Sequence, residues 1–180
     1  MIPPLAPTLL TPRLTLRPHR AADLNACVEL WQDPVVTRHT TGIPLARQDV
    51  WTRLLRHPGH WALLGFGYWV LEERPSGRFV GEVGLGHFKR DLLGGHPELD
   101  AVPEAGWVLL PWAHGKGYAH EAMAAVLAWR DANLLGGDSF CLIRPENGAS
   151  LRLAGKLGFV ERERVAEGSA ATALLVRPPR

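Results

Sequence analysis

The chain has 180 residues, of which 46% are hydrophobic and 21% are charged, and its net charge is +2. This length suits one domain with a single core, and the composition is that of a globular protein and not of a disordered one. Because the net charge is small and the basic residues are spread along the chain, nothing indicates binding to nucleic acid or to a membrane surface.

The two cysteines, Cys27 and Cys141, lie far apart, and each stands within an apolar run. We expect buried free thiols in a reducing compartment, without a disulfide, a catalytic thiol or a structural metal. Residues 1–10 lack the basic start and the apolar run of a signal peptide. We therefore expect a cytoplasmic protein with a single domain over 1–180 and a core of about 9–177.

The first half of the chain predicts a strand, two helices and a hairpin. Alternation of apolar and polar residues predicts a strand over 9–17, followed by a helix that ends at Asp33-Pro34. A weaker helix pattern covers 45–56, and His57-Pro58-Gly59 is expected to end it. Two strands follow over 68–73 and 78–88, and a long exposed loop is expected over 89–103.

In the second half, one strand runs into a glycine-bearing loop and then into a helix. The strand is predicted over 105–110, the loop over 112–118, and the helix starts near Tyr118. The remaining predicted elements are a strand over 140–143, a short helix over 147–157 and two antiparallel strands over 159–165 and 171–176.

A strand, a glycine loop and a helix in this order form a general anion-binding device. The first helical turn carries about four unpaired N–H groups at the positive end of the dipole, and glycines let them approach a phosphate. Alone, Gly115-Lys116-Gly117 is a weak signal. The chain has no Walker-type GxxxxGK[ST] loop, and His120 replaces the last glycine of a dinucleotide GxGxxG motif.

The surrounding segments make the loop specific. Five stretches carry the pattern: Leu10–Leu14, Glu104–Leu109, His114–Ala122, Asn147–Ser150 and Lys156–Phe159. Together they resemble the GCN5-related N-acetyltransferase (GNAT) superfamily, in its RimJ/RimL-like branch of ribosomal-protein-alanine acetyltransferases. One position departs from the family pattern, because His114 stands where the motif has Arg or Gln.

The resemblance implies an α+β fold, with a mixed, largely antiparallel twisted sheet of six to seven strands and about four flanking helices. It also implies acetyl-CoA as co-substrate and no metal. The residues that it places at the cofactor are Val108, Leu109, Leu110, His114, Gly115, Lys116, Gly117, Tyr118, Ala119, His120, Asn147 and Ser150. The backbone N–H of Leu109 or Leu110 is a candidate to polarise the thioester carbonyl.

An acetyl transfer to an amine needs a proton acceptor and a proton donor. Glu104, just before the cofactor strand, is the first candidate base, and Ser150 is the candidate acid. The only tyrosines are Tyr68 and Tyr118, and Tyr118 belongs to the loop. Weaker candidates at the acceptor are Glu82 and His87, expected on opposite faces of their strand.

Two tryptophans of the predicted helices, Trp31 and Trp51, are the best candidates for an acceptor wall. Glu98 and Asp100 in the long loop are further candidates to recognise a cationic acceptor. The leading hypothesis is direct attack of a primary amine on acetyl-CoA in a ternary complex, by a monomer or homodimer (class EC 2.3.1.-). The acceptor is a protein N-terminus or a small amine. The alternatives are a non-catalytic acyl-CoA-binding sensor or scaffold, and a dimerisation module without a ligand.

Overall fold

The computed structural model describes residues 6–134, 136–167 and 170–179. Its eight strands form one sheet in the order β1-β2-β3-β4-β5-β6-β8-β7, in which all neighbours are antiparallel except β5 and β6. The α+β architecture is therefore confirmed, with one strand more than expected. The strand bounds are β1 Leu9–Leu10, β2 Leu14–Arg17, β3 Tyr68–Glu73, β4 Phe79–Gly86, β5 Glu104–Leu109, β6 Ser139–Ile143, β7 Val160–Glu167 and β8 Ala170–Arg177.

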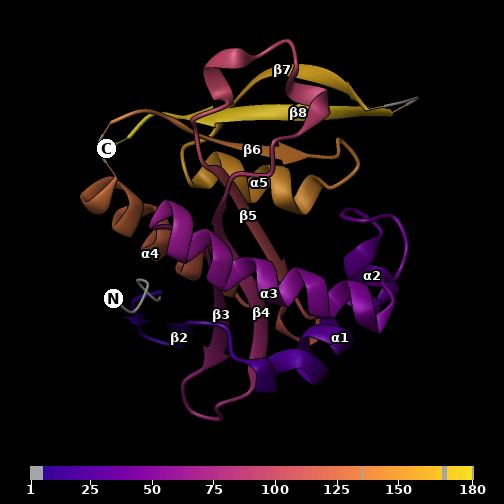
Figure 1. Cartoon of the computed structure of the whole chain (residues 1–180), viewed down its shortest axis with the longest axis vertical. Helices are drawn as coiled ribbons and strands as arrows, with labels where there is room; N and C mark the ends of the chain where they lie inside the picture. Colours follow the sequence, from indigo (N-terminus) through magenta and orange to yellow (C-terminus); the bar gives the residue numbers. More distant parts are fainter. Residues whose placement is uncertain (1–5, 135, 168–169, 180) are drawn as a thin grey trace.

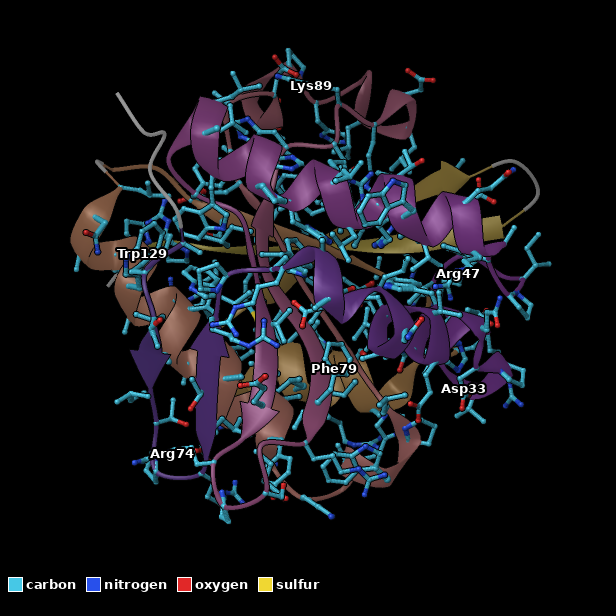
Figure 2. All side chains as sticks on the ribbon, turned by 60° about the horizontal axis from the view of Figure 1, so that its bottom comes forward. Asp33, Arg47, Arg74, Phe79, Lys89 and Trp129 are labelled. Carbon is cyan, nitrogen blue, oxygen red and sulfur yellow. The ribbon has the colours of Figure 1, made fainter. Side chains whose placement is uncertain are left out.

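Five α-helices lie within the described residues. They are α1 Leu24–Gln32, α2 Pro34–Thr37, α3 Arg47–Leu64, α4 Tyr118–Asn133 and α5 Gly148–Lys156. In Figures 1 and 2, α1 and α3 cross in front of the central strands, and α4 lies behind them. None of the described helices combines the length and apolar character that crossing a bilayer requires.

The sheet separates two buried clusters, in keeping with the alternation of side chains along a strand. Trp69, Val83 and Leu85 belong to the larger cluster, which also includes Met123 of α4. The smaller cluster joins α1 and α3 through Leu30, Trp31 and Leu54.

The prediction that α3 ends at His57-Pro58-Gly59 is wrong. The helix continues through Pro58 to Leu64, and Gly65 closes it in the left-handed conformation with φ 73°. Proline removes one helical hydrogen bond, but the following turn carries Trp61, which packs edge-on against Trp69 and Trp129. His57 thus lies within the helix, and its side chain is buried.

Two other boundaries also differ from the sequence prediction. The expected first strand over 9–17 is a short hairpin of β1 and β2. The loop expected over 89–103 contains two 3-10 turns, Asp91–Leu93 and Pro97–Leu99. Short 3-10 turns carry no long periodic pattern, so the sequence alone gives little sign of them.

Between β5 and β6 the sheet changes from antiparallel to parallel pairing. The register of this pair contains Glu104 opposite Phe140, whereas β4 and β5 pair at six positions from Gly81–Leu109 to Gly86–Glu104. Beyond Glu104 the edge of β5 that faces β6 is thus open over the rest of the strand. The candidate site lies at this opening.

Candidate active site

The glycine loop connects β5 to α4 as predicted. After the 3-10 turn Pro111–Ala113, Gly115 and Gly117 adopt positive φ angles of 72° and 79°, which favour glycine. The His114 side chain turns back, and its Nε2 donates a hydrogen bond to the Leu109 carbonyl at 2.8 Å. The residue that departs from the family pattern therefore joins the loop to the end of β5.

The start of α4 presents backbone N–H groups to a groove. The first helical hydrogen bond runs from Glu121 N–H to Gly117 O, so the N–H groups of 118–120 precede the hydrogen-bonded part of the helix. The groove, called here the loop groove, has a volume of about 550 Å³. Its lining includes Leu109, His114, Gly115, Gly117, Tyr118, Ala119, His120 and Arg152.

A second cavity, called here the inner cavity, adjoins the loop groove and has a volume of about 220 Å³. Its walls include Trp31, Arg53, Tyr68, Arg90, Glu104, Gly106 and Arg144. Six residues line both hollows: His39, Thr40, Trp107, Val108, Asn147 and Ser150. The two hollows therefore adjoin at these residues, which include the hydrogen-bonded pair of Trp107 and Ser150.

Glu104 lies in the inner cavity, where the candidate base was expected. The side chain is 8% exposed, and Arg90 holds both carboxylate oxygens, with Nε–Oε2 at 2.6 Å and Nη2–Oε1 at 2.7 Å. A bidentate pair of this kind fixes the orientation of the carboxylate. Arg90 was not among the predicted site residues, because it lies 14 residues before Glu104 in the chain, at the start of the irregular segment after β4.

Ser150 has a defined hydrogen-bond role at the junction. Its Oγ accepts the indole N–H of Trp107 at 3.2 Å, and its own N–H donates to the side chain of Asn147 at 3.2 Å. Asn147 thus caps α5. Because Oγ accepts from Trp107, the hydroxyl hydrogen of Ser150 can be donated to a group in the site.

Three of the residues expected at the cofactor have specific partners in the structure. The N–H of Leu110 is bonded to Val80 O at 2.9 Å, so it is not free to polarise a thioester carbonyl. Lys116 extends over the Trp112 ring at 4.7 Å and does not line the loop groove. The Tyr118 hydroxyl donates to Glu73 at 2.5 Å, and this hydrogen bond raises the pKa of Tyr118.

Of the two tryptophans expected at the acceptor wall, the structure places one in the inner cavity. Trp31 lines it, with the Arg53 guanidinium stacked 3.8 Å above its ring. Trp51 lies in a different hollow, beside Leu24 and Arg47. The other tyrosine, Tyr68, also lines the inner cavity, and only glycine fits opposite it, because a Cβ at Gly106 would lie 2.1 Å from its hydroxyl.

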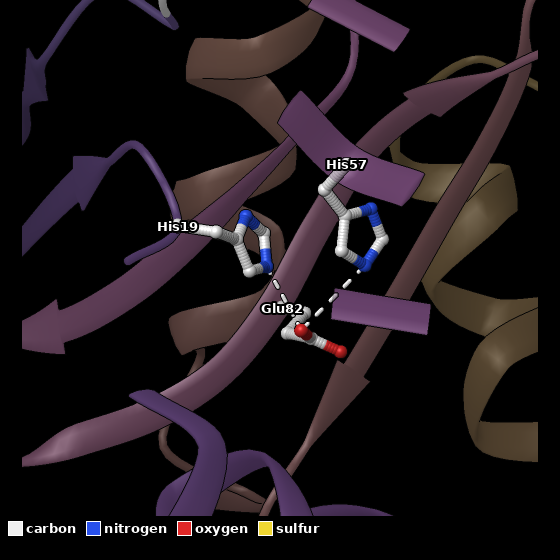
Figure 3. Close-up of side chains that lie close together, drawn as sticks. All are labelled: His19, His57 and Glu82. Atoms are coloured by element: carbon white, nitrogen blue, oxygen red, sulfur yellow. Dashed lines mark hydrogen bonds and ion pairs between the residues drawn. The ribbon is translucent and has the colours of Figure 1, made fainter. Parts of the chain in front are cut away.

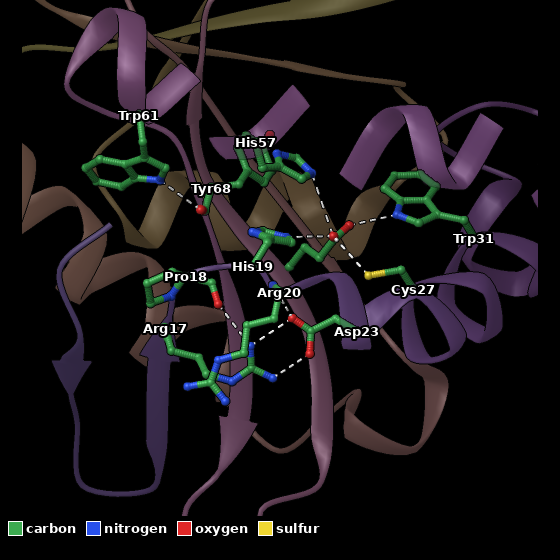
Figure 4. Close-up of polar contacts among 11 residues, drawn as sticks. Arg17, Pro18, His19, Arg20, Asp23, Cys27, Trp31, His57, Trp61 and Tyr68 are labelled. Carbon is green, nitrogen blue, oxygen red and sulfur yellow. Dashed lines mark hydrogen bonds and ion pairs between the residues drawn. The ribbon is translucent and has the colours of Figure 1, made fainter. Parts of the chain in front are cut away.

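Behind Trp31, a buried carboxylate contacts side chains of α1, of α3 and of the segment that follows β2. Glu82 of β4 accepts the Trp31 indole N–H at 2.7 Å and the His19 Nε2–H at 2.8 Å. The Cys27 thiol lies 3.5 Å away, and His57 Nε2 lies 3.7 Å away. Figure 4 shows Trp31, Cys27, His19 and His57 converging on one point. Glu82 is thus a support for the wall of the inner cavity and not a part of its lining.

The charges in this buried group can be assigned from its environment. Burial disfavours ionisation of Glu82, but the His19 hydrogen bond and the charges around it outweigh burial and hold its pKa below the usual range. Burial and the neighbouring His19 hold the pKa of His57 well below its usual range. Glu82 is therefore a carboxylate, and His57 is a neutral imidazole.

His19, His57 and Glu82 also bring three metal-ligand atoms within 4.8 Å of one another (Figure 3). The two imidazole rings stack, with centroids 4.2 Å apart and planes at 22°. A zinc ion binds an imidazole nitrogen at about 2.0–2.1 Å, along the lone pair in the ring plane. Two nearly parallel rings at this separation do not share such a point, so the geometry is that of a stacked, hydrogen-bonded group.

The remaining acceptor candidates lie outside the inner cavity. His87 lines a neighbouring hollow with Phe88 and Asp100, and burial lowers its pKa. Asp100 pairs with Lys89 at 2.8 Å, and Glu98 lies 3.2 Å from Arg162. The loop acids are thus engaged with basic side chains of their own surroundings.

Comparison with known proteins agrees with this architecture. Residues 13–160 match the family model of the acetyltransferase (GNAT) domain. The uncharacterized protein YkkB of Bacillus subtilis is 30% identical over 154 residues, which cover 84% of each chain. A Bordetella pertussis structure assigned to the GnaT family superposes with a TM-score of 0.83 at 34% identity, over 96% of this chain and 99% of that one.

More distant structures share the fold. Spermidine N-acetyltransferase from Vibrio cholerae, in complex with CoA and spermine, has a TM-score of 0.72 at 18% identity, with 94% of this chain and 97% of that one covered. Ribosomal-protein-S5-alanine acetyltransferase from Vibrio fischeri has a TM-score of 0.69 at 17% identity, with 97% of both covered.

Proposed function

Because the chain belongs to the GNAT family of acetyltransferases, we propose that it moves the acetyl group of acetyl-CoA to a primary amine by direct attack in a ternary complex. The observation that carries the proposal is the junction of the loop groove with the inner cavity at Trp107 and Ser150. A cofactor in the groove and an amine in the cavity would meet there.

The loop groove fits coenzyme A by its chemistry. The N–H groups of 115–120, at the positive end of α4, would hold the diphosphate. The open edge of β5 at Val108 and Leu109 would pair with the amide groups of the pantetheine arm, with Asn147 on the opposite side. A related fold in complex with CoA supports this assignment.

In the reaction, the neutral amine attacks the thioester carbonyl carbon, the C–N bond forms, and the C–S bond breaks. Glu104 would accept the proton that the amine loses, directly or through a water molecule, and Arg90 would keep the carboxylate oriented. Ser150 would donate a hydrogen bond or a proton to the departing thiolate. Within the RimJ/RimL-like branch, the acceptor would be a protein N-terminus or a small amine.

The test measures the amine-dependent release of free CoA thiol from acetyl-CoA, with a panel of amines. We expect Glu104→Gln and Ser150→Ala to lower kcat by about 10²-fold or more, and Glu104→Gln to leave the Kd for acetyl-CoA unchanged. Glu98→Gln is the matched control, because Glu98 lies outside both hollows. Acetyl-CoA binding without turnover for any amine would instead support an acyl-CoA sensor, and unchanged kcat in both variants would remove the assigned roles.

A further inference from the structure

The charges that face the inner cavity are mostly positive. Its lining contains three arginines, Arg53, Arg90 and Arg144, and one carboxylate, Glu104. The Arg90–Glu104 pair is internally neutral, which leaves two guanidinium groups to be balanced. Resting on the proposed function, we propose that the acceptor is a small amine that also carries an oxyanion, a carboxylate in the first instance, and that Arg53 binds this group.

Arg53 is held at the cavity without an acidic partner. Among the residues that the structure describes, no carboxylate forms an ion pair with it, and its Nε is buried without a hydrogen-bond partner. A buried, unpaired donor on a charged group is costly. A ligand carboxylate in the cavity would balance the charge of this guanidinium, and its two oxygens match two parallel N–H donors.

The position of Arg53 is fixed before any ligand arrives. Its Cζ lies over the Trp31 ring, 3.8 Å from the centroid, and the Trp31 N–H donates to the buried carboxylate of Glu82 at 2.7 Å. A side chain positioned in this way loses little freedom on binding, which favours affinity. The buried group of His19, His57 and Glu82 therefore has a role in recognition, through Trp31.

Hydrogen-bonding groups of the lining complement this assignment. The lining that contains Arg144 also contains His39, Thr40 and Thr41. The two threonine hydroxyl groups can also donate hydrogen bonds to an oxyanion. Among the described residues, no ion pair engages Arg144. A polycation such as a polyamine would instead meet two unbalanced positive charges, and like charges in a partly buried cavity repel.

Charge and size together define the acceptor class. The volume of about 220 Å³ suits a small molecule, since drug-sized sites run from about 300 Å³ upward. The amine would lie toward Glu104 and Ser150, and the oxyanion toward Arg53. This arrangement is that of an amino acid or a close analogue, which would bind as a zwitterion and lose the ammonium proton to Glu104 before the amine attacks.

The experiment compares sets of three compounds that differ at one group. Methionine, phenylalanine and glutamate are each tested beside the carboxamide and the decarboxylated amine, with spermidine as the polycation. Initial rates give kcat/KM, and calorimetric titration into the protein saturated with CoA gives binding without the need for turnover. We expect at least one amino acid to exceed its amide and its amine by about 10-fold or more in both measurements.

Variants assign the preference to Arg53. We expect Arg53→Gln to lower kcat/KM and affinity for the acid about 10–100-fold and to leave the amide within about twofold. Arg53→Lys should recover part of the loss, since it keeps the charge without the planar fork. Arg56→Gln is the control, because Arg56 lies on the same helix, stacks on Phe88 and does not line the cavity.

The outcomes separate this inference from the proposed function. Turnover of amides or spermidine in preference to every acid, or an unchanged preference in Arg53→Gln, would overturn the inference and leave the acetyl transfer intact. Arg53-dependent binding of an acid without any thiol release would support the inference and contradict the transfer. No binding of any acid to the CoA complex would also overturn the inference.

Discussion

Trp31 connects the buried carboxylate of Glu82 to the wall of the inner cavity, so its replacement by phenylalanine probes both. The change removes the indole N–H that Glu82 accepts at 2.7 Å, and it leaves one oxygen of a 1% exposed carboxylate without that donor. A lost hydrogen bond to a charged group costs about 1.5–3 kcal/mol. The smaller ring also gives up two carbons of buried contact, at about 0.8 kcal/mol each.

We therefore expect Trp31→Phe to lower the free energy of unfolding by about 3–5 kcal/mol. For a chain of this size, that loss corresponds to a fall in Tm of roughly 10 °C. Urea unfolding followed by circular dichroism, with a thermal scan in parallel, measures both quantities. Because Arg53 rests on this ring, the variant should also weaken acceptor binding more than acetyl-CoA binding.

The matched control is Trp51→Phe, the same chemical change on α3 at a side chain that is 37% exposed. It should alter the free energy of unfolding by about 0.5 kcal/mol or less, as surface substitutions generally do. Equal destabilisation by the two variants would refute the reasoning. It would mean that the Trp31–Glu82 hydrogen bond contributes nothing beyond ring size.

Three further predictions concern single positions. His57→Phe keeps a flat ring but no titratable nitrogen; since the pKa of His57 is depressed in the fold, the unfolded chain binds the extra proton below about pH 6.5, and stability falls as the pH falls. Wild type should thus lose about 1–2 kcal/mol more than His57→Phe between pH 7 and pH 5, and equal losses in urea titrations would contradict the assignment. Gly117→Ala puts a Cβ at a φ of 79°, which costs about 1–2 kcal/mol and should raise the Kd for acetyl-CoA in calorimetry. Gly59→Ala, inside α3 with open space around the added Cβ, should raise the free energy of unfolding by about 0.5–1 kcal/mol.

Local patterns predicted much of this fold. Both ends of the strand Tyr68–Glu73 and the start of α4 at Tyr118 agree with the prediction. Alternation of apolar residues and the positions of glycines are local signals, so the sequence contains them. The helix α3 was ended too early, since its continuation past Pro58 depends on the contacts of Trp61 with distant aromatic rings. Local propensity contains no information on such contacts.

The candidate site divides in the same way. The loop groove follows from a contiguous motif, so the place of Gly115 and Gly117 in its lining could be predicted from the sequence. The charges of the inner cavity were not, because Arg53 and Arg90 become neighbours of the site only through the packing of α3 and of the irregular segment after β4. Glu82 was named as a contact of the acceptor, and the structure gives it a supporting position behind Trp31.

The opening between β5 and β6 has a consequence for how this molecule can diversify. On the proposed function, the cofactor side would be made from the sheet and the start of α4, and the acceptor wall from α1 and α3, which pack together in a separate cluster. Changes at 53 would thus alter the acceptor with little effect on the larger cluster, whereas a change at 31 also costs stability through Glu82. The fold separates the part that must stay constant for one co-substrate from the part that selection can vary, so new acceptor specificities can arise without a new acetyl donor site.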